Sequence, residues 1–151
     1  MIVLALLIGI IAGLRALTAP AAVSWAAYNG SLPLDGSILA FLGYRFTPWI
    51  LSLLALAELV TDQLPSTPSR KVPPQFAVRV LMGAISGGAI GASMAMLWSG
   101  VVLGIVGAVL GTYGGAAARA WLASAFGRDR PAALIEDAVA ILGAALIVMA
   151  L

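Results

Sequence analysis

The chain of 151 residues is 62% apolar and only 9% charged, a composition far more apolar than that of an ordinary soluble domain and typical of an integral membrane protein. Its eight basic and six acidic residues leave a net charge of +2, too small and too scattered for a nucleic-acid-binding surface. The sequence contains no cysteine and no histidine, which excludes disulfides, thiolate nucleophiles, imidazole bases and the usual zinc ligands. We therefore expect no cofactor and no metal, and any proton chemistry would use carboxylates, tyrosine, lysine or arginine.

The protein is predicted to be all-α and polytopic, with a single integral membrane domain over residues 1–151. A spanning helix needs about 20 mostly apolar residues. Glycine, proline, asparagine and charged residues divide the chain into segments near that length. The five predicted transmembrane helices cover Ile2–Ala27, Thr47–Gln63, Gln75–Leu97, Val101–Phe126 and Pro131–Leu151.

The first predicted helix carries both an arginine and a proline. Residues 19–21 resemble a signal-peptide cleavage site, but the chain lacks a basic start and Arg15 interrupts the apolar run, so we expect the segment to be retained. Pro20 should kink or break this helix. Either the kink is simply tolerated, or the break exposes helix ends that bind an ion, as in many transporters.

The segment over residues 28–46, between the first two predicted helices, opens with turn residues and then has an apolar run too short to span. Two alternatives are open for it, and for residues 36–46 in particular. It is either an interfacial or re-entrant piece, or an N-terminal extension of the second helix.

The basic residues predict the orientation in the membrane. Arg70 and Lys71 lie in the second connection and Arg128 and Arg130 in the fourth, and these connections face the same side if the chain crosses five times. Cytoplasmic loops carry an excess of lysine and arginine. The sequence therefore predicts a cytoplasmic N-terminus and a C-terminus on the opposite side.

Glycines recur at steps of four in the third and fourth predicted helices, and residues four apart lie on one helix face. These are Gly83, Gly87 and Gly91 in the third helix, and Gly107, Gly111 and Gly115 in the fourth. Small residues let helix backbones approach closely in lipid. The two rows are therefore predicted to be helix-packing surfaces of the glycine-zipper kind, which in a transporter could also form a sliding seam.

Seven charged residues fall inside or at the edges of the predicted spans: Arg15, Glu58, Asp62, Arg79, Arg119, Glu136 and Asp137. Each costs about 2.5 to 3.5 kcal/mol at mid-membrane, so leaving all of them unpaired would cost on the order of 20 kcal/mol, more than a typical small domain can supply. Glu58 and Asp62, four residues apart, share a helix face. We expect all seven to converge in a polar cluster toward the cytoplasmic side. The cluster is either a set of structural salt bridges or the lining of a route for an ion, a proton or a small polar solute.

The order of charges along the chain makes the helix pairs 1–2 and 4–5 candidates for an inverted repeat. In each pair an arginine-bearing helix, with Arg15 or Arg119, precedes an acidic helix. With five spans the two pairs would cross the membrane in opposite senses, the arrangement expected of such repeats.

Three stretches of the chain resemble a known family: GLRALTAPAAVSW near the start, AELVTDQLPSTPSR at the end of the second predicted helix, and ARAWLASAFGRDRPAALIEDAVAI across the last two. Together they resemble the bacterial membrane proteins grouped as domain-of-unknown-function family 4126 (DUF4126). Acidic signatures similar to those of the family are formed here by Glu58, Asp62, Pro65, Glu136 and Asp137. The resemblance implies a bacterial inner-membrane protein and implies no activity, because the family is itself uncharacterised.

The leading prediction is a small transporter or ion- or proton-conducting protein, with the lipid bilayer and a small ion or polar solute as partners. We expect a homo-oligomer, because five short helices enclose little volume. The alternative is a non-catalytic scaffold or assembly subunit in which the charges are structural. A lipid-modifying enzyme with Glu58 or Asp62 as general base ranks below both, and we predict no enzymatic activity, since no histidine, cysteine or serine-elbow pattern accompanies the carboxylates.

Overall fold

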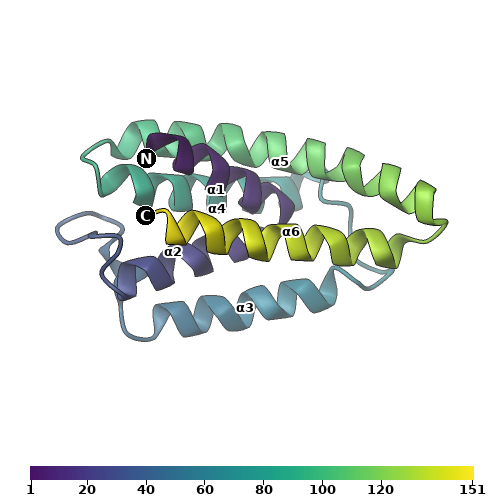
Figure 1. The fold of residues 1–151 in the computed structure, drawn as a ribbon, viewed down its shortest axis with the longest axis horizontal. Coiled ribbons are helices and arrows are strands. Elements are labelled where there is room, and N and C mark those ends of the chain that lie inside the picture. Colours follow the sequence, from purple (N-terminus) through teal and green to yellow (C-terminus); the bar gives the residue numbers. More distant parts are fainter.

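The computed structural model describes residues 1–151 and consists of six α-helices and one short 3-10 helix joined by turns. The elements are α1 (Ile2–Leu14), α2 (Thr18–Tyr28), the 3-10 helix η1 (Ala40–Gly43), α3 (Thr47–Thr61), α4 (Pro73–Ala92), α5 (Leu97–Phe126) and α6 (Asp129–Met149). They form a bundle that is elongated along α5, its longest helix (Figure 1). The prediction of an all-α fold is confirmed.

Three helices, α4, α5 and α6, are long and apolar enough to cross a membrane, and α1 and α3 are apolar but shorter. The outside of the bundle is also apolar: Leu53, Leu142 and Leu146 are each more than 60% exposed. Extensive exposed apolar surface is unfavourable in water and is expected where lipid is the solvent. These features suggest a membrane protein, whereas the five predicted spans are not confirmed.

The first predicted span consists of two helices instead of one. Because α1 ends at Leu14 and α2 begins at Thr18, the break lies at residues 15–17 and Pro20 occupies the third position of α2. Proline is tolerated in the first turn of a helix, where its missing N–H would have no partner. In a continuous helix it would remove a hydrogen bond and clash with the preceding turn. The proline therefore favours a new helix that starts just before it.

After the break, α2 turns back toward the end of the bundle at which α1 began (Figure 1). The N–H of Leu17 donates to Glu58 near the end of α3, and Trp25 Nε1 donates to Ser52 Oγ nearer its start, so α2 runs antiparallel to α3. The pair of helices thus enters the bundle and returns without crossing it.

Both termini consequently lie at one end of the bundle, on the left of Figure 1, which we call the terminal end. The prediction that the termini face opposite sides is wrong, because it counted residues 2–27 as one crossing. The predicted inverted repeat is not matched either. The first predicted helix is broken into α1 and α2, and the chain turns back between them. The fourth predicted helix, its counterpart in the repeat, belongs to α5, an unbroken helix of 30 residues.

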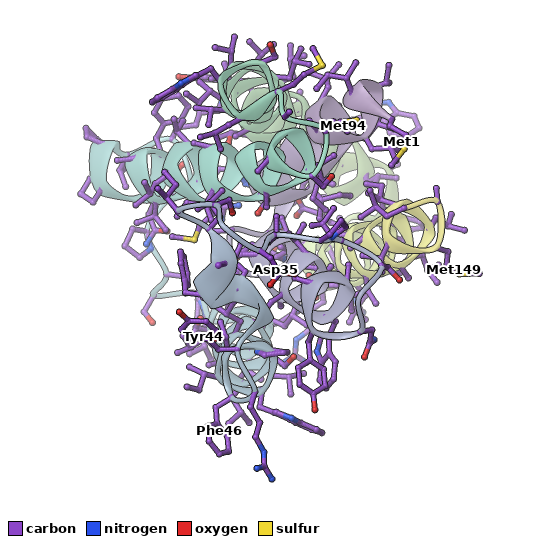
Figure 2. The ribbon with its side chains drawn as sticks, turned by 90° about the vertical axis from the view of Figure 1, so that its left-hand side faces the viewer. Met1, Asp35, Tyr44, Phe46, Met94 and Met149 are labelled. Carbon is purple, nitrogen blue, oxygen red and sulfur yellow. The ribbon has the colours of Figure 1, made fainter.

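The segment between α2 and α3 packs onto the terminal end. Its Leu32 and Leu42 are almost fully buried, and Ser24 Oγ of α2 donates to the carbonyl oxygen of Leu42. Figure 2 looks directly at this end and shows Met1 and Met94 above Asp35, Met149 level with Asp35 on the right, and Tyr44 and Phe46 below them. Of the two alternatives for this segment, the structure matches a piece that does not cross the bundle, since α3 begins only at Thr47.

Glycines bring α1 and α4 into backbone contact with α5. A Cβ placed on Gly83 of α4 would lie 2.6 Å from the carbonyl oxygen of Gly104, and one on Gly107 would lie 2.8 Å from the backbone nitrogen of Ile10 in α1. No larger side chain fits at such distances. The helices can approach this closely because glycine has no side chain beyond a hydrogen atom. The two predicted glycine rows thus face different helices: Gly83, Gly87 and Gly91 face α5, and Gly107 and Gly111 face α1.

Candidate functional site

Most of the charged residues of the protein lie in one arginine–carboxylate network. Its members are Arg15, Glu58, Asp62, Arg70, Arg79, Arg119, Asp129, Glu136 and Asp137. The network extends from the helix break toward the end of the bundle that holds the α3–α4 and α5–α6 connections, on the right of Figure 1, which we call the charged end.

Arg15 is the centre of the network and is fully buried at the helix break. Its Nε donates to Asp137 Oδ1 of α6 at 2.6 Å, and its Nη1 donates to Asp62 at the end of α3. Glu136 Oε2 lies 3.7 Å from its Nη2. The planar guanidinium has donors on several edges, so one arginine can bind carboxylates from two helices at once. A lysine could not reproduce this geometry.

The two helix ends at the break are stabilised by side chains of opposite charge. Glu58 accepts hydrogen bonds from the N–H groups of Ala16 (2.7 Å) and Leu17 (2.8 Å), at the start of α2. Arg79 Nη1 donates to the carbonyl oxygens of Gly13 (2.9 Å) and Leu14 (2.7 Å), at the end of α1. A carboxylate at a helix N-terminus and a cation at a C-terminus both interact favourably with the helix dipole, and here they also bind backbone groups that have no partner within the helix.

A second layer of ion pairs surrounds Glu136 nearer the charged end. Arg70 binds both oxygens of Glu136, with Nη2 at 2.7 Å from Oε2, and Arg119 Nη1 lies 3.4 Å from Oε2. Arg119 binds Asp129 more closely, through Nε at 3.0 Å and Nη2 at 2.6 Å. Gly115 leaves room for this layer, because a Cβ there would lie 3.0 Å from Arg70 Nη1.

The structure brings all seven charged residues predicted from the sequence into the network. The adjacent acids of α6 bind mainly different partners, Arg70 for Glu136 and Arg15 for Asp137. Sequence reasoning treated Arg70 only as an orientation signal and overlooked Asp129. The short turn after α5 could have revealed Asp129, because it places the last turns of α5 beside the first turns of α6.

Gln63 was also missed by sequence reasoning. Its Nε2 donates to Asp137 Oδ2 at 2.8 Å, so this carboxylate is held by an amide as well as by Arg15. The hydroxyl groups near Pro20 do not cap the break: Thr18 Oγ1 has no hydrogen-bond partner, and Ser24 Oγ donates to the carbonyl oxygen of Leu42. Glu58 accepts from the N–H groups at the start of α2, which could be known only once α3 was seen to lie beside the break.

A polar pocket of about 640 Å³ opens at the charged end, between the α3–α4 connection and the α5–α6 turn. Ten of its 15 lining residues carry polar or charged side chains. Asp62 and Arg79 belong to both the pocket lining and the network. The pocket therefore connects the charged end with the side chains around the helix break.

No protein-family model, no curated protein and no solved structure matches this chain. The resemblance to family 4126 stays a prediction that rests on the quoted sequence stretches.

Proposed function

We propose that the protein is a small membrane transporter or ion-conducting protein, and that the arginine–carboxylate network lies on the path of the transported species. The observation that carries this proposal is the position of the break between α1 and α2, inside the bundle and next to a polar pocket of about 640 Å³. Broken helices near mid-membrane that adjoin a polar cavity are a recurring way of building ion and solute sites.

The charged side chains of the network have alternative partners, which gives a physical basis for rearranging the ion pairs during transport. Arg79 Nη2 lies 3.6 Å from Asp62 and 3.9 Å from Glu58, so each of its acidic neighbours is within reach without a large displacement. Arg15 likewise has three carboxylates nearby. Exchange of partners in such a network avoids leaving a buried charge uncompensated, which is the costly event in a low-dielectric interior. An arriving ion or solute could therefore displace one pair at modest cost.

We also propose that the charged end faces the cytoplasm in a bacterial inner membrane and that both termini face the opposite side. The basic connections that hold Arg70, Lys71, Arg128 and Arg130 all belong to this end, and excess lysine and arginine mark cytoplasmic loops. The re-entrant α1 and α2 leave an even number of crossings, so this orientation replaces the predicted cytoplasmic N-terminus.

Single cysteines would test the orientation cleanly because the chain has none of its own. We expect Asp35→Cys at the terminal end to react with a membrane-impermeant maleimide added to intact spheroplasts. Ser69→Cys, in the α3–α4 connection, should react only after lysis. The reverse pattern would show that the charged end faces outward.

Flux through reconstituted protein tests the transport proposal. We expect liposomes containing wild-type protein to pass at least one of protons, chloride, phosphate or potassium, and Glu58→Gln to reduce that flux about tenfold or more. Glutamine keeps the shape of the side chain but removes the charge that caps α2 and faces Arg79, and charged hydrogen bonds contribute about 1.5 to 3 kcal/mol each.

Asp35→Asn is the matched control, since it removes the one carboxylate that lies outside the network. Its flux should equal that of the wild type. An absence of flux for every tested ion, or a Glu58→Gln variant that loses stability but conducts normally, would count against transport.

A non-catalytic scaffold is the second candidate function. It is favoured by the fact that every carboxylate of the network has at least one arginine within 4 Å. In this alternative the network holds α3, α4, α5 and α6 in register around the break, and the flux experiment gives no signal. The expected homo-oligomer stays a prediction under either function.

A further inference from the structure

The pocket at the charged end is rich in arginine. Five guanidinium groups line it, those of Arg70, Arg79, Arg119, Arg128 and Arg130, against two carboxylates. Guanidinium groups are strongly represented wherever proteins bind phosphate or carboxylate groups, because their fork of donors matches the oxygens of these anions. Arg70, Arg79 and Arg119 are paired with acids of the network, so the excess positive charge comes from Arg128 and Arg130. This excess is the first sign that the pocket suits an anion.

The two carboxylates of the pocket are already occupied. Asp62 is held by Arg15 and lies 3.6 Å from Arg79, and Asp129 accepts two hydrogen bonds from Arg119. A cation entering the pocket would have to compete with these arginines for oxygens. The pocket therefore offers no free carboxylate with which to bind one.

Two arginines of the pocket are free. Arg128 and Arg130 are exposed and make no ion pair, whereas Arg79, only 3% exposed, is bound to the end of α1. The first turn of α6 also belongs to the pocket wall and has no side-chain cap at Arg128, the residue before the helix. The backbone N–H groups of Asp129 and Arg130 at this helix start favour a bound anion, although Pro131 after them has no N–H. The unused donors thus come from the α5–α6 turn and the start of α6.

We propose that this pocket is a binding site for a phosphate-bearing anion, in which Arg128 and Arg130 provide the main contacts at the start of α6. Its volume of about 640 Å³ exceeds what a single phosphate requires and lies in the usual range for sites that enclose a whole small ligand. The charged and polar side chains of its lining suit the polar part of a phosphomonoester. The phosphate group can come from a soluble compound or from the headgroup of a lipid, since both present the same oxygens to the arginines.

This inference names a ligand class for the pocket on which the transport proposal rests, but it is tested by binding, without flux. Protein purified in a neutral detergent is titrated with inorganic phosphate by calorimetry, against chloride at the same ionic strength to control for screening. We expect saturable binding of phosphate by the wild type. The double variant Arg128→Gln/Arg130→Gln should bind at least about tenfold more weakly, since it loses two charged donors.

Arg45→Gln is the matched control, because Arg45 is a cation in the segment between α2 and α3 at the terminal end and it makes no ion pair. It should bind phosphate as the wild type does. Thermal unfolding of each variant without ligand would show that weaker binding is not caused by loss of the fold. Arg128 and Arg130 are exposed, so both variants are expected to fold.

A second arm identifies the source of the phosphate. Phosphatidic acid, whose headgroup is a phosphomonoester, and phosphatidylcholine are offered separately, and retained lipid is counted by native mass spectrometry. Binding of inorganic phosphate assigns the site to soluble ligands. Selective retention of phosphatidic acid without phosphate binding assigns it to lipid, and either result supports the proposal if Arg128→Gln/Arg130→Gln weakens the binding at least about tenfold. Binding of neither probe, or equal binding by the double variant and Arg45→Gln, would overturn it, even if flux of another ion were observed.

Discussion

Replacing Arg15 with methionine is expected to lower the free energy of unfolding by about 3 to 5 kcal/mol. The methionine side chain fills a similar volume but leaves Asp62 and Asp137 without their shared buried cation. Removing one partner of a buried ion pair is costly because the remaining charge keeps its desolvation penalty and loses its compensation. Equilibrium unfolding in mixed detergent–SDS micelles, followed by circular dichroism, measures the change.

Two further variants show whether uncompensated charge is the cause. Arg45→Gln removes an exposed arginine at the other end and should change stability by less than about 0.5 kcal/mol. Adding Asp137→Asn to Arg15→Met should recover part of the loss, because it neutralises one of the stranded carboxylates. A loss below about 1 kcal/mol for Arg15→Met, or no recovery in the double variant, would mean that Arg15 does not hold the network together.

Replacing Gly104 with alanine is expected to destabilise the protein by about 1 to 3 kcal/mol, although alanine is the better helix former. Gly104 lies where α5 meets both α1 and α4, and a Cβ there would be 2.9 Å from the backbone carbon of Gly83. Backbone cannot move aside as a flexible side chain can, so the methyl group must push the two helices apart. The same unfolding experiment measures the effect.

Gly114→Ala is the matched control on the same helix, since a Cβ at Gly114 would meet nothing within 4 Å. This substitution should be neutral or stabilising by up to about 1 kcal/mol through helix propensity alone. If both alanine variants behaved alike, close approach of backbones would not be what positions α1 and α4 on α5.

The predictions from the sequence were most reliable where one residue type has few physical alternatives. A buried charge must find a partner, so Arg15, Glu58 and Asp62 could be expected to converge without knowledge of the fold. A glycine every fourth residue marks a close-packing face for the same kind of reason. Neither argument identifies the partner helix, and Gly104, which contacts both α1 and α4, lies outside the two predicted rows.

The prediction failed at the first helix because hydropathy does not show whether an apolar segment continues straight or turns back on itself. Residues 2–27 are apolar enough for one crossing, and Pro20 indicated only a kink or break. Whether the chain continues or returns after a break depends on what binds the exposed helix ends. Here the ends are bound by Glu58 and Arg79, which lie 41 to 66 residues away along the chain.

The sequence by itself determined the helical class of this protein and the set of charges that had to be paired, and it indicated a lipid environment, because composition and desolvation cost depend on residue types alone. Only the tertiary structure decided that the chain turns back between α1 and α2, that both termini share one end, and that Arg128 and Arg130 remain free beside a pocket. These properties depend on contacts between distant segments, above all the side chains that stabilise the two helix ends at the break.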